Sequence, residues 1–146
     1  MRKLALDLGT KTCGFALSDE NGIIASNLKT IQFDEQDFAV VISEISGLLK
    51  IYEIDALILG YPLRSNGAKS ERTEMVEQFA KDLQKSFSLK VYLVNEYGTT
   101  IKATSILKSA KMSIKKRKKH KDTLSATLIL QDFLEYGGKE FGNEPT

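Results

Sequence analysis

The sequence has one cysteine and one histidine in 146 residues, which limits both its cross-links and its metal chemistry. Cys13 alone cannot form an intramolecular disulfide, and a free thiol is typical of a protein kept in the reducing cytoplasm. A structural zinc site usually takes four nitrogen or sulfur ligands, so this class of site is excluded. Any metal bound here is expected to be a hard cation held by oxygen atoms.

Long apolar runs are also missing. No stretch approaches the ~20 apolar residues of a membrane-spanning helix, and no signal peptide precedes Leu4. With 42% hydrophobic and 27% charged residues, the composition is that of an ordinary globular protein of one-domain size. We expect a single cytoplasmic domain without a membrane partner.

Acidic residues are absent from one segment of the chain. Between Lys108 and Lys121 there are eight Lys or Arg residues and no Asp or Glu, while the remainder carries 13 basic and 19 acidic residues. An acidic body with one basic segment is the charge pattern expected for a protein that contacts a polyanion at one place.

The apolar residues that are present change period along the chain. Alternating or continuous apolar runs predict strands, and apolar residues three and four apart predict helices. The expected strands are Leu4–Leu8, Cys13–Ser18, Ile23–Ile31, Ala56–Leu59 and Val91–Val94, and the expected helices begin near Asp37, Met75, Thr99 and Asp122. This order predicts an α/β domain with a mixed five-stranded sheet flanked by helices. We expect one domain over residues 1–138 and a disordered tail over 139–146.

Three carboxylates lie where ligands gather in an α/β sheet. Asp7 is near the end of the first strand, Glu96 at the end of the last strand, and Asp122 at the start of the last helix. Converging carboxylates repel each other unless a cation lies between them, and Mg²⁺ or Mn²⁺ suits such ligands. Two such ions ~4 Å apart can activate water for attack on a phosphodiester.

Each carboxylate also has a structural explanation. Asp122 is a common kind of helix N-cap, and Glu96 is compatible with a surface position at a strand end. Asp7 is the hardest to explain in this way, because an apolar strand inside a sheet rarely holds a charge. Pairing with Thr10 or with the amides of the Gly9 turn is the alternative for Asp7. Spacing alone does not decide between these explanations.

Candidate phosphate contacts, most of them basic side chains, lie in three places: the first turn, the loop after Gly60-Tyr61-Pro62, and the lysine run before Asp122. We expect the lysine run to be a loop that leads directly to Asp122, and Arg72 adds a further cation after the second loop. Because no aromatic residues interleave with the lysines, contact with phosphates is favoured over base reading. The alternatives are a solvated loop for the lysine run and an ordinary strand-to-helix connection for the loop after Gly60-Tyr61-Pro62, and His120 is expected to be an exposed polar residue. The candidates are Thr10, Lys11, Arg64, Lys69, Lys115, Lys116, Arg117, Lys118 and Lys119.

Four motifs together resemble a known family. They are LALDLGTKTCGFALSD, LILGYPLRSNG, VNEYGTT and KDTLSATLILQDFL, in order from Leu4 to Leu134. This set is similar to the YqgF/RuvX family, whose first acid corresponds to Asp7 and whose last corresponds to Asp122. The resemblance implies an RNase H-like fold related to RuvC-type Holliday-junction resolvases. It also implies a divalent-metal nuclease, which acts in 5′-end maturation of pre-16S rRNA or in resolution of Holliday junctions.

The third motif departs from the family pattern. Where the family reads Asp-Glu-Arg, this chain reads Asn95-Glu96-Tyr97. Neighbouring residues of a strand face opposite sides, so only one of Asn95 and Glu96 can share a cluster with Asp7. Glu96 as the ligand predicts an intact catalytic set of Asp7, Glu96 and Asp122, whereas Asn95 favours a nucleic-acid-binding protein that does not cleave. The opening motif also begins the phosphate loop of actin-like ATPases, but those proteins need a second domain. Monomer and homodimer are both compatible with the sequence.

Overall fold

A computed structural model of the chain describes residues 1–63, 66–95 and 114–142, with the side chains of all but 114–123. Its elements are the strands β1 (Arg2–Leu8), β2 (Thr12–Ser18), β3 (Ala25–Gln32), β4 (Ile54–Tyr61), β5 (Lys90–Asn95) and β6 (Lys139–Glu140), and the helices α1 (Ala39–Ile51), α2 (Glu71–Ser86) and α4 (Ile114–Tyr136).

The strands form one mixed sheet in the order β3-β2-β1-β4-β5-β6. β1, β4 and β5 run parallel to one another, and β2, β3 and β6 are antiparallel to their neighbours. The parallel strands therefore end at the same side of the sheet, which we call the carboxyl edge, with Leu8, Tyr61 and Asn95 as their last residues. The opposite side is the amino edge.

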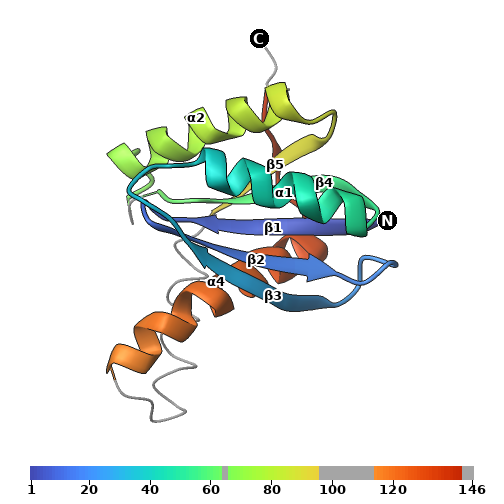
Figure 1. Cartoon of the computed structure of the whole chain (residues 1–146), viewed down its shortest axis with the longest axis horizontal. Coiled ribbons are helices and arrows are strands. Elements are labelled where there is room, and N and C mark those ends of the chain that lie inside the picture. The colour runs from blue at the N-terminus through green and yellow to red at the C-terminus, as the bar shows by residue number, and fades with distance from the viewer. Residues whose placement is uncertain (64–65, 96–113, 143–146) are drawn as a thin grey trace.

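Helices cover both faces of the sheet (Figure 1). Alternate residues along β1 and β4, such as Leu6 and Leu59, pack with α1 and α2 in the larger hydrophobic cluster. Ala5, Ile58 and Val94 point to the other face and pack against α4 through residues such as Ile129. We call these the α1/α2 face and the α4 face. The alternation predicted for buried strands thus assigns each strand residue to one face.

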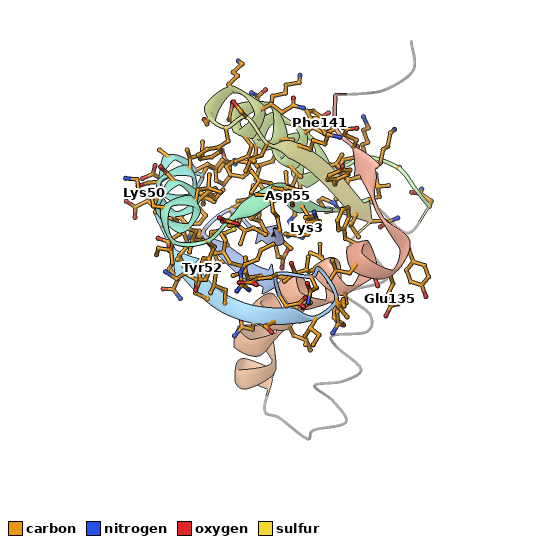
Figure 2. The ribbon with its side chains drawn as sticks, turned by 90° about the vertical axis from the view of Figure 1, so that its right-hand side faces the viewer. Lys3, Lys50, Tyr52, Asp55, Glu135 and Phe141 are labelled. Atoms are coloured by element: carbon orange, nitrogen blue, oxygen red, sulfur yellow. The ribbon has the colours of Figure 1, made fainter. Side chains whose placement is uncertain are left out.

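An ion pair joins two parallel strands at the amino edge. Lys3 of β1 and Asp55 of β4 approach to 2.6 Å, and Figure 2 shows the two side chains side by side. Both are partly exposed, so the pair contributes little to stability, on the order of 1 kcal/mol or less. Because Asp55 lies at the amino edge, a substitution of this residue can serve as a control for substitution of an acid at the carboxyl edge.

The prediction of a mixed α/β sheet is confirmed, but the sheet has six strands instead of five. The sixth strand, β6, consists of only two residues, with Glu140 opposite Tyr92 and Lys139 opposite Leu93. So short a strand has no apolar pattern, and the sequence therefore places its residues in the expected tail instead of the sheet. Residues 143–146, the rest of the expected tail, lie outside the described residues.

The start of the last helix also differs from the prediction. Helix α4 begins at Ile114, so residues 114–121 are helical and Asp122 lies inside the helix instead of at its N-cap. Lysine and arginine are good helix formers, and the stretch before Asp122 contains neither proline nor glycine. The helix expected after Thr99 lies outside the described residues. In the described part of the chain, no helix is long and apolar enough to cross a membrane.

Candidate active site at the carboxyl edge

Asp7 lies at the carboxyl edge with its side chain on the α4 face. It is one residue from the end of β1 and is 8% exposed. Because it lies two residues after Ala5 on the same strand, its side chain is on the same face of the sheet as Ala5. Its antiparallel partner on β2 is Gly14. On β4, Gly60 follows Leu59, the partner of Leu6, so a second glycine lies beside Asp7. Neither neighbouring strand therefore places a side chain next to this carboxylate.

The guanidinium of Arg72 approaches Asp7 from α2. Its Nη2 lies 3.5 Å from Asp7 Oδ1 and donates a hydrogen bond of 3.1 Å to the Leu8 carbonyl oxygen. The Arg72 side chain is 45% exposed. The side chain thus extends over the end of β1, from a helix on one face to a carboxylate on the other.

The turn between β1 and β2 carries two of the predicted nucleic-acid contacts, Thr10 and Lys11, and both are exposed. Their carbonyl oxygens accept hydrogen bonds from the amides of Gln36 (2.7 Å) and Phe33 (2.9 Å) in the loop after β3. Gln36 has φ 58°, in the left-handed region that non-glycine residues seldom adopt. The turn is therefore held by a second loop whose backbone is strained.

Lys69, another predicted nucleic-acid contact, lies in the loop after β4 and is engaged within the protein. Its Nζ and the hydroxyl of Tyr61 each donate a hydrogen bond of 3.0 Å to Glu77 Oε2. Burial, together with the bond to Glu77, raises the pKa of Tyr61. Because the Lys69 side chain is 59% exposed, its ammonium group remains accessible to solvent.

Sequence reasoning did not single out Gln36 or Glu77. Glu77 contacts Tyr61 across 16 residues of sequence, and Gln36 contacts the β1–β2 turn through its backbone. Neither contact leaves a local pattern of residue types that could be recognised in advance.

Asn95 lies on the face opposite to Asp7. Its partner on β4 is Tyr61, which packs in the cluster of the α1/α2 face, whereas Val94 packs in the cluster of the α4 face. Of the two residues that compete for a place beside Asp7, Asn95 is thus directed away from it. Glu96 lies outside the described residues.

The remaining predicted site residues are described only in part. Arg64 lies outside the described residues. Asp122 and the run Lys115–Lys119 are placed as backbone within α4, and their side chains are not described. The first turns of α4 project beyond the sheet on the side where β1 ends (Figure 1). The basic run therefore lies at the same end of the molecule as Asp7.

The described residues fit a hard cation at Asp7, although they do not by themselves complete a site. Among the side chains that the structure describes, no three His, Cys, Asp or Glu residues gather into a metal-binding group. Asp7 offers carboxylate oxygens, the ligand type that Mg²⁺ prefers, in a place that two glycines leave clear of neighbouring strand side chains.

Cys13 lies next to the site but is not part of it. It is fully buried, pairs with Leu8 across the sheet and packs in the cluster of the α1/α2 face. Burial and, to a smaller extent, the negative charge of Asp7 raise the pKa of its thiol well above the usual range. The thiol is therefore protonated at neutral pH, as expected for a small strand residue.

The fold is shared by two solved resolvases. Thermus thermophilus RuvC in complex with a Holliday junction substrate matches with a TM-score of 0.57 at 11% identity, over 97% of this chain and 99% of RuvC. Fowlpox virus resolvase in complex with Holliday junction DNA matches with a TM-score of 0.53 at 18% identity, over 92% of this chain and 97% of the resolvase. At these identities the likeness concerns the fold alone, and it identifies that fold as RNase H-like.

The family follows from sequence comparison. The model of the RuvX family, described as "Holliday junction resolvase", matches residues 1–136. A relative from Mycoplasmopsis pulmonis is 47% identical over 135 residues, covering 92% of both chains, and carries the name "Putative pre-16S rRNA nuclease". A relative of the same name from Bacillus subtilis is 43% identical over 92% of this chain and 98% of its own length.

The chain belongs to the RuvX family, as its four motifs predict. Membership of this family of RNase H-like resolvases implies dependence on a divalent metal ion.

Proposed function

We propose that this protein is a metal-dependent endonuclease that hydrolyses phosphodiester bonds during 5′-end processing of pre-16S rRNA. The proposal is carried by the buried Asp7 at the carboxyl edge of an RNase H-like sheet, in a chain 47% identical to a relative named for that activity. Processing of a ribosomal precursor is a cytoplasmic step, so we infer a cytoplasmic protein that acts as a monomer or homodimer.

Asp7, Glu96 and Asp122 are the proposed ligands of Mg²⁺ or Mn²⁺. When bound, the ions supply a water activated for attack and neutralise charge on the leaving oxygen. The protein contributes three oxygen ligands: one from the end of β1, one after β5 and one from α4. Because the metal activates the water, no histidine base is needed, which suits a chain whose one histidine is His120.

Glu96 is a better candidate for the second ligand than Asn95. Asn95 lies at the level of Tyr61 on the α1/α2 face, while Asp7 is directed to the α4 face. The replacement of the family's aspartate by Asn95 therefore falls on the side of the strand away from the proposed metals. This favours a cleaving enzyme over a protein that only binds.

Phosphates are proposed to bind along the same end of the molecule. Thr10 and Lys11 are exposed beside Asp7, and the helical run Lys115–Lys119 begins α4 on that side. Like charges three and four residues apart destabilise a helix by a few tenths of a kcal/mol per pair, approximately. Nucleic acid would relieve that repulsion and bring its backbone toward the metals. Arg64 and Lys69 are further contacts on the loop after β4.

The test of the reaction uses a pre-16S rRNA 5′ fragment with Mg²⁺ or Mn²⁺. We expect cleavage by the wild type and loss of cleavage, by a factor of 10² or more (approximately), in Asp7→Asn. Asp55→Asn removes a carboxylate at the amino edge of the same sheet and should cleave like the wild type. Cleavage by Asp7→Asn at the wild-type rate would contradict the proposed active site.

A second pair of variants tests the choice of ligand. Glu96→Gln is expected to abolish cleavage, whereas Asn95→Ala is expected to leave it within about twofold of the wild type, because Asn95 faces away from Asp7. The opposite ranking would identify Asn95 as the residue beside the metals.

The lysine run is tested by matched quadruple variants. Substitution of four lysines by glutamine at 115, 116, 118 and 119 should weaken binding of substrate and lower its dependence on salt. Each lost phosphate contact removes approximately 0.7 from the slope of log K against log salt for single strands. Glutamines at the exposed Lys50, Lys81, Lys85 and Lys90 remove the same charge elsewhere and should leave the slope unchanged. Equal slopes in both variants would exclude the run as the main contact.

Holliday-junction resolution is the second candidate function. It is favoured by the description of the family model. A synthetic four-way junction, tested beside the rRNA fragment, separates the two functions by which substrate is cut. Binding of either substrate without cutting, unchanged by Asp7→Asn, would instead support a nucleic-acid-binding member of the family.

A further inference from the structure

Arg72 connects the two faces of the sheet at the carboxyl edge. It belongs to the first turn of α2 on the α1/α2 face, yet its Nη2 lies 3.5 Å from Oδ1 of Asp7, which is directed to the α4 face. The same nitrogen donates a hydrogen bond to the carbonyl oxygen of Leu8, the last residue of β1. One side chain thus contacts both the proposed first metal ligand and the backbone beside it.

The backbone that carries Arg72 is fixed on both sides. Ser70 and Thr73 form a capping box, in which the Ser70 amide donates to Thr73 Oγ1 (2.9 Å) and the Thr73 amide donates to Ser70 Oγ (3.3 Å). The hydroxyl of Thr73, which is fully buried, donates to the carbonyl oxygen of Pro62 just after β4. Arg72 is therefore anchored to the ends of β1 and β4, and its position relative to Asp7 is defined by the fold.

The contact between Arg72 and Asp7 is of a kind that a metal ion can replace. At 3.5 Å it is longer than the approximately 2.7–2.9 Å of a strong charge-assisted hydrogen bond, and the arginine side chain is 45% exposed. A guanidinium in this place offsets the charge of a carboxylate that is 8% exposed. A divalent ion bound to the same carboxylate would meet a positive charge within a few ångströms.

We propose that Arg72 is a positioning residue that holds Asp7 in the metal-free protein and competes with the divalent ion for this carboxylate. This inference rests on the proposed function, because it assumes that Asp7 binds metal. Arg72 keeps the carboxylate in place before the ion arrives, at the expense of weaker metal binding. Release of the guanidinium from Asp7 then accompanies metal binding, while the bond to Leu8 retains it at the carboxyl edge.

The test measures Mn²⁺ binding without substrate, from the paramagnetic resonance signal of the free ion. Repulsion between a divalent ion and a cation ~4 Å away, even when screened by water, weakens binding on the order of tenfold. Arg72→Gln should therefore bind Mn²⁺ more tightly by that factor, and Arg72→Lys, which keeps the charge, should stay near the wild type. Arg2→Gln removes an arginine that bonds to a backbone carbonyl at the other end of β1, and it should have no effect.

Two results would overturn the inference. The first is Mn²⁺ binding by Arg72→Gln that equals the wild type or is weaker, as expected if Arg72 has only a structural role. In the wild-type protein, addition of Mg²⁺ should also shift the side-chain Nε resonance of Arg72, and an unchanged resonance would equally contradict the competition. This second measurement does not depend on the folding of a variant.

Asp7→Asn distinguishes failure of the inference from failure of the proposed function. If the wild type binds Mn²⁺ and Asp7→Asn does not, the metal site stands, and the Arg72 variants test the competition alone. If binding in the wild type is absent or indifferent to Asp7→Asn, the proposed active site and the inference both fail.

Discussion

Replacing Thr73 by valine tests how the structure holds the loop between β4 and α2. Valine keeps the volume and the branched shape of threonine but removes Oγ1, which accepts from the Ser70 amide at 2.9 Å and donates to the Pro62 carbonyl oxygen. Thr73 is fully buried, so water cannot take the place of the missing hydroxyl in these hydrogen bonds. The substitution therefore removes one half of a capping box and the tie between α2 and the end of β4.

The magnitude follows from these two losses. Loss of a capping interaction costs approximately 1 kcal/mol, and a partly buried carbonyl left without its donor costs approximately 1–2 kcal/mol. We expect Thr73→Val to lower the free energy of unfolding by about 2–3 kcal/mol, which for a chain of this size lowers Tm by roughly 5–10 °C.

Thermal unfolding followed by circular dichroism measures this effect. Ser70→Ala removes the other half of the capping box but leaves the Pro62 carbonyl bonded to Thr73, so it should cost only about 1 kcal/mol. The difference between the two variants reports the tie to β4. A Thr73→Val protein as stable as Ser70→Ala would show that the bond to Pro62 does not contribute to stability and does not anchor the backbone that carries Arg72.

Three further predictions concern the surroundings of the site. Because the pKa of Tyr61 is raised in the folded protein, the stability that its protonated hydroxyl contributes is complete below the ordinary tyrosine pKa and is lost as pH rises through the folded-state pKa. In ultraviolet titration, Glu77→Gln should move the ionisation of Tyr61 to lower pH. An unchanged midpoint would contradict the contact between Tyr61 and Glu77. The buried thiol of Cys13 should resist iodoacetamide at neutral pH until the protein unfolds, so rapid alkylation of the native protein would contradict the raised pKa. Gln36→Gly should raise the free energy of unfolding by approximately 0.5–1 kcal/mol in denaturant titration, because glycine adopts φ 58° without strain; a loss of stability would mean that the Gln36 side chain contributes more than the strain costs.

The sequence was most informative where structure depends on local pattern. Apolar runs such as Leu4–Leu8 and Ala56–Leu59 predicted the buried strands of the sheet, and helical periodicity predicted α1 and α2. Both signals depend on residues a few positions apart. The position of Asp7 at the end of a central strand followed directly from them.

Features that depend on register or on competing local preferences were predicted less well. Asp122 has the preferred chemistry of an N-cap, but an uninterrupted lysine-rich stretch before it allows α4 to start at Ile114. The side of the sheet on which Asn95 lies required the pairing of Tyr61 with Asn95. The contact of Arg72 with Asp7 joins residues 65 positions apart, which no local pattern encodes.

Helix α4 has a consequence for the order in which the protein becomes complete during synthesis. It packs on one face of the sheet, where Ala5, Ala16 and Ile58 from the first 58 residues meet Ile129 and Leu130. A nascent chain that ends before residue 114 lacks α4 and with it the contacts that Ile129 and Leu130 make with these residues. Until α4 has been synthesised, these apolar strand residues lack the helix that packs on them, and exposed apolar surface of this kind favours aggregation of the growing polypeptide.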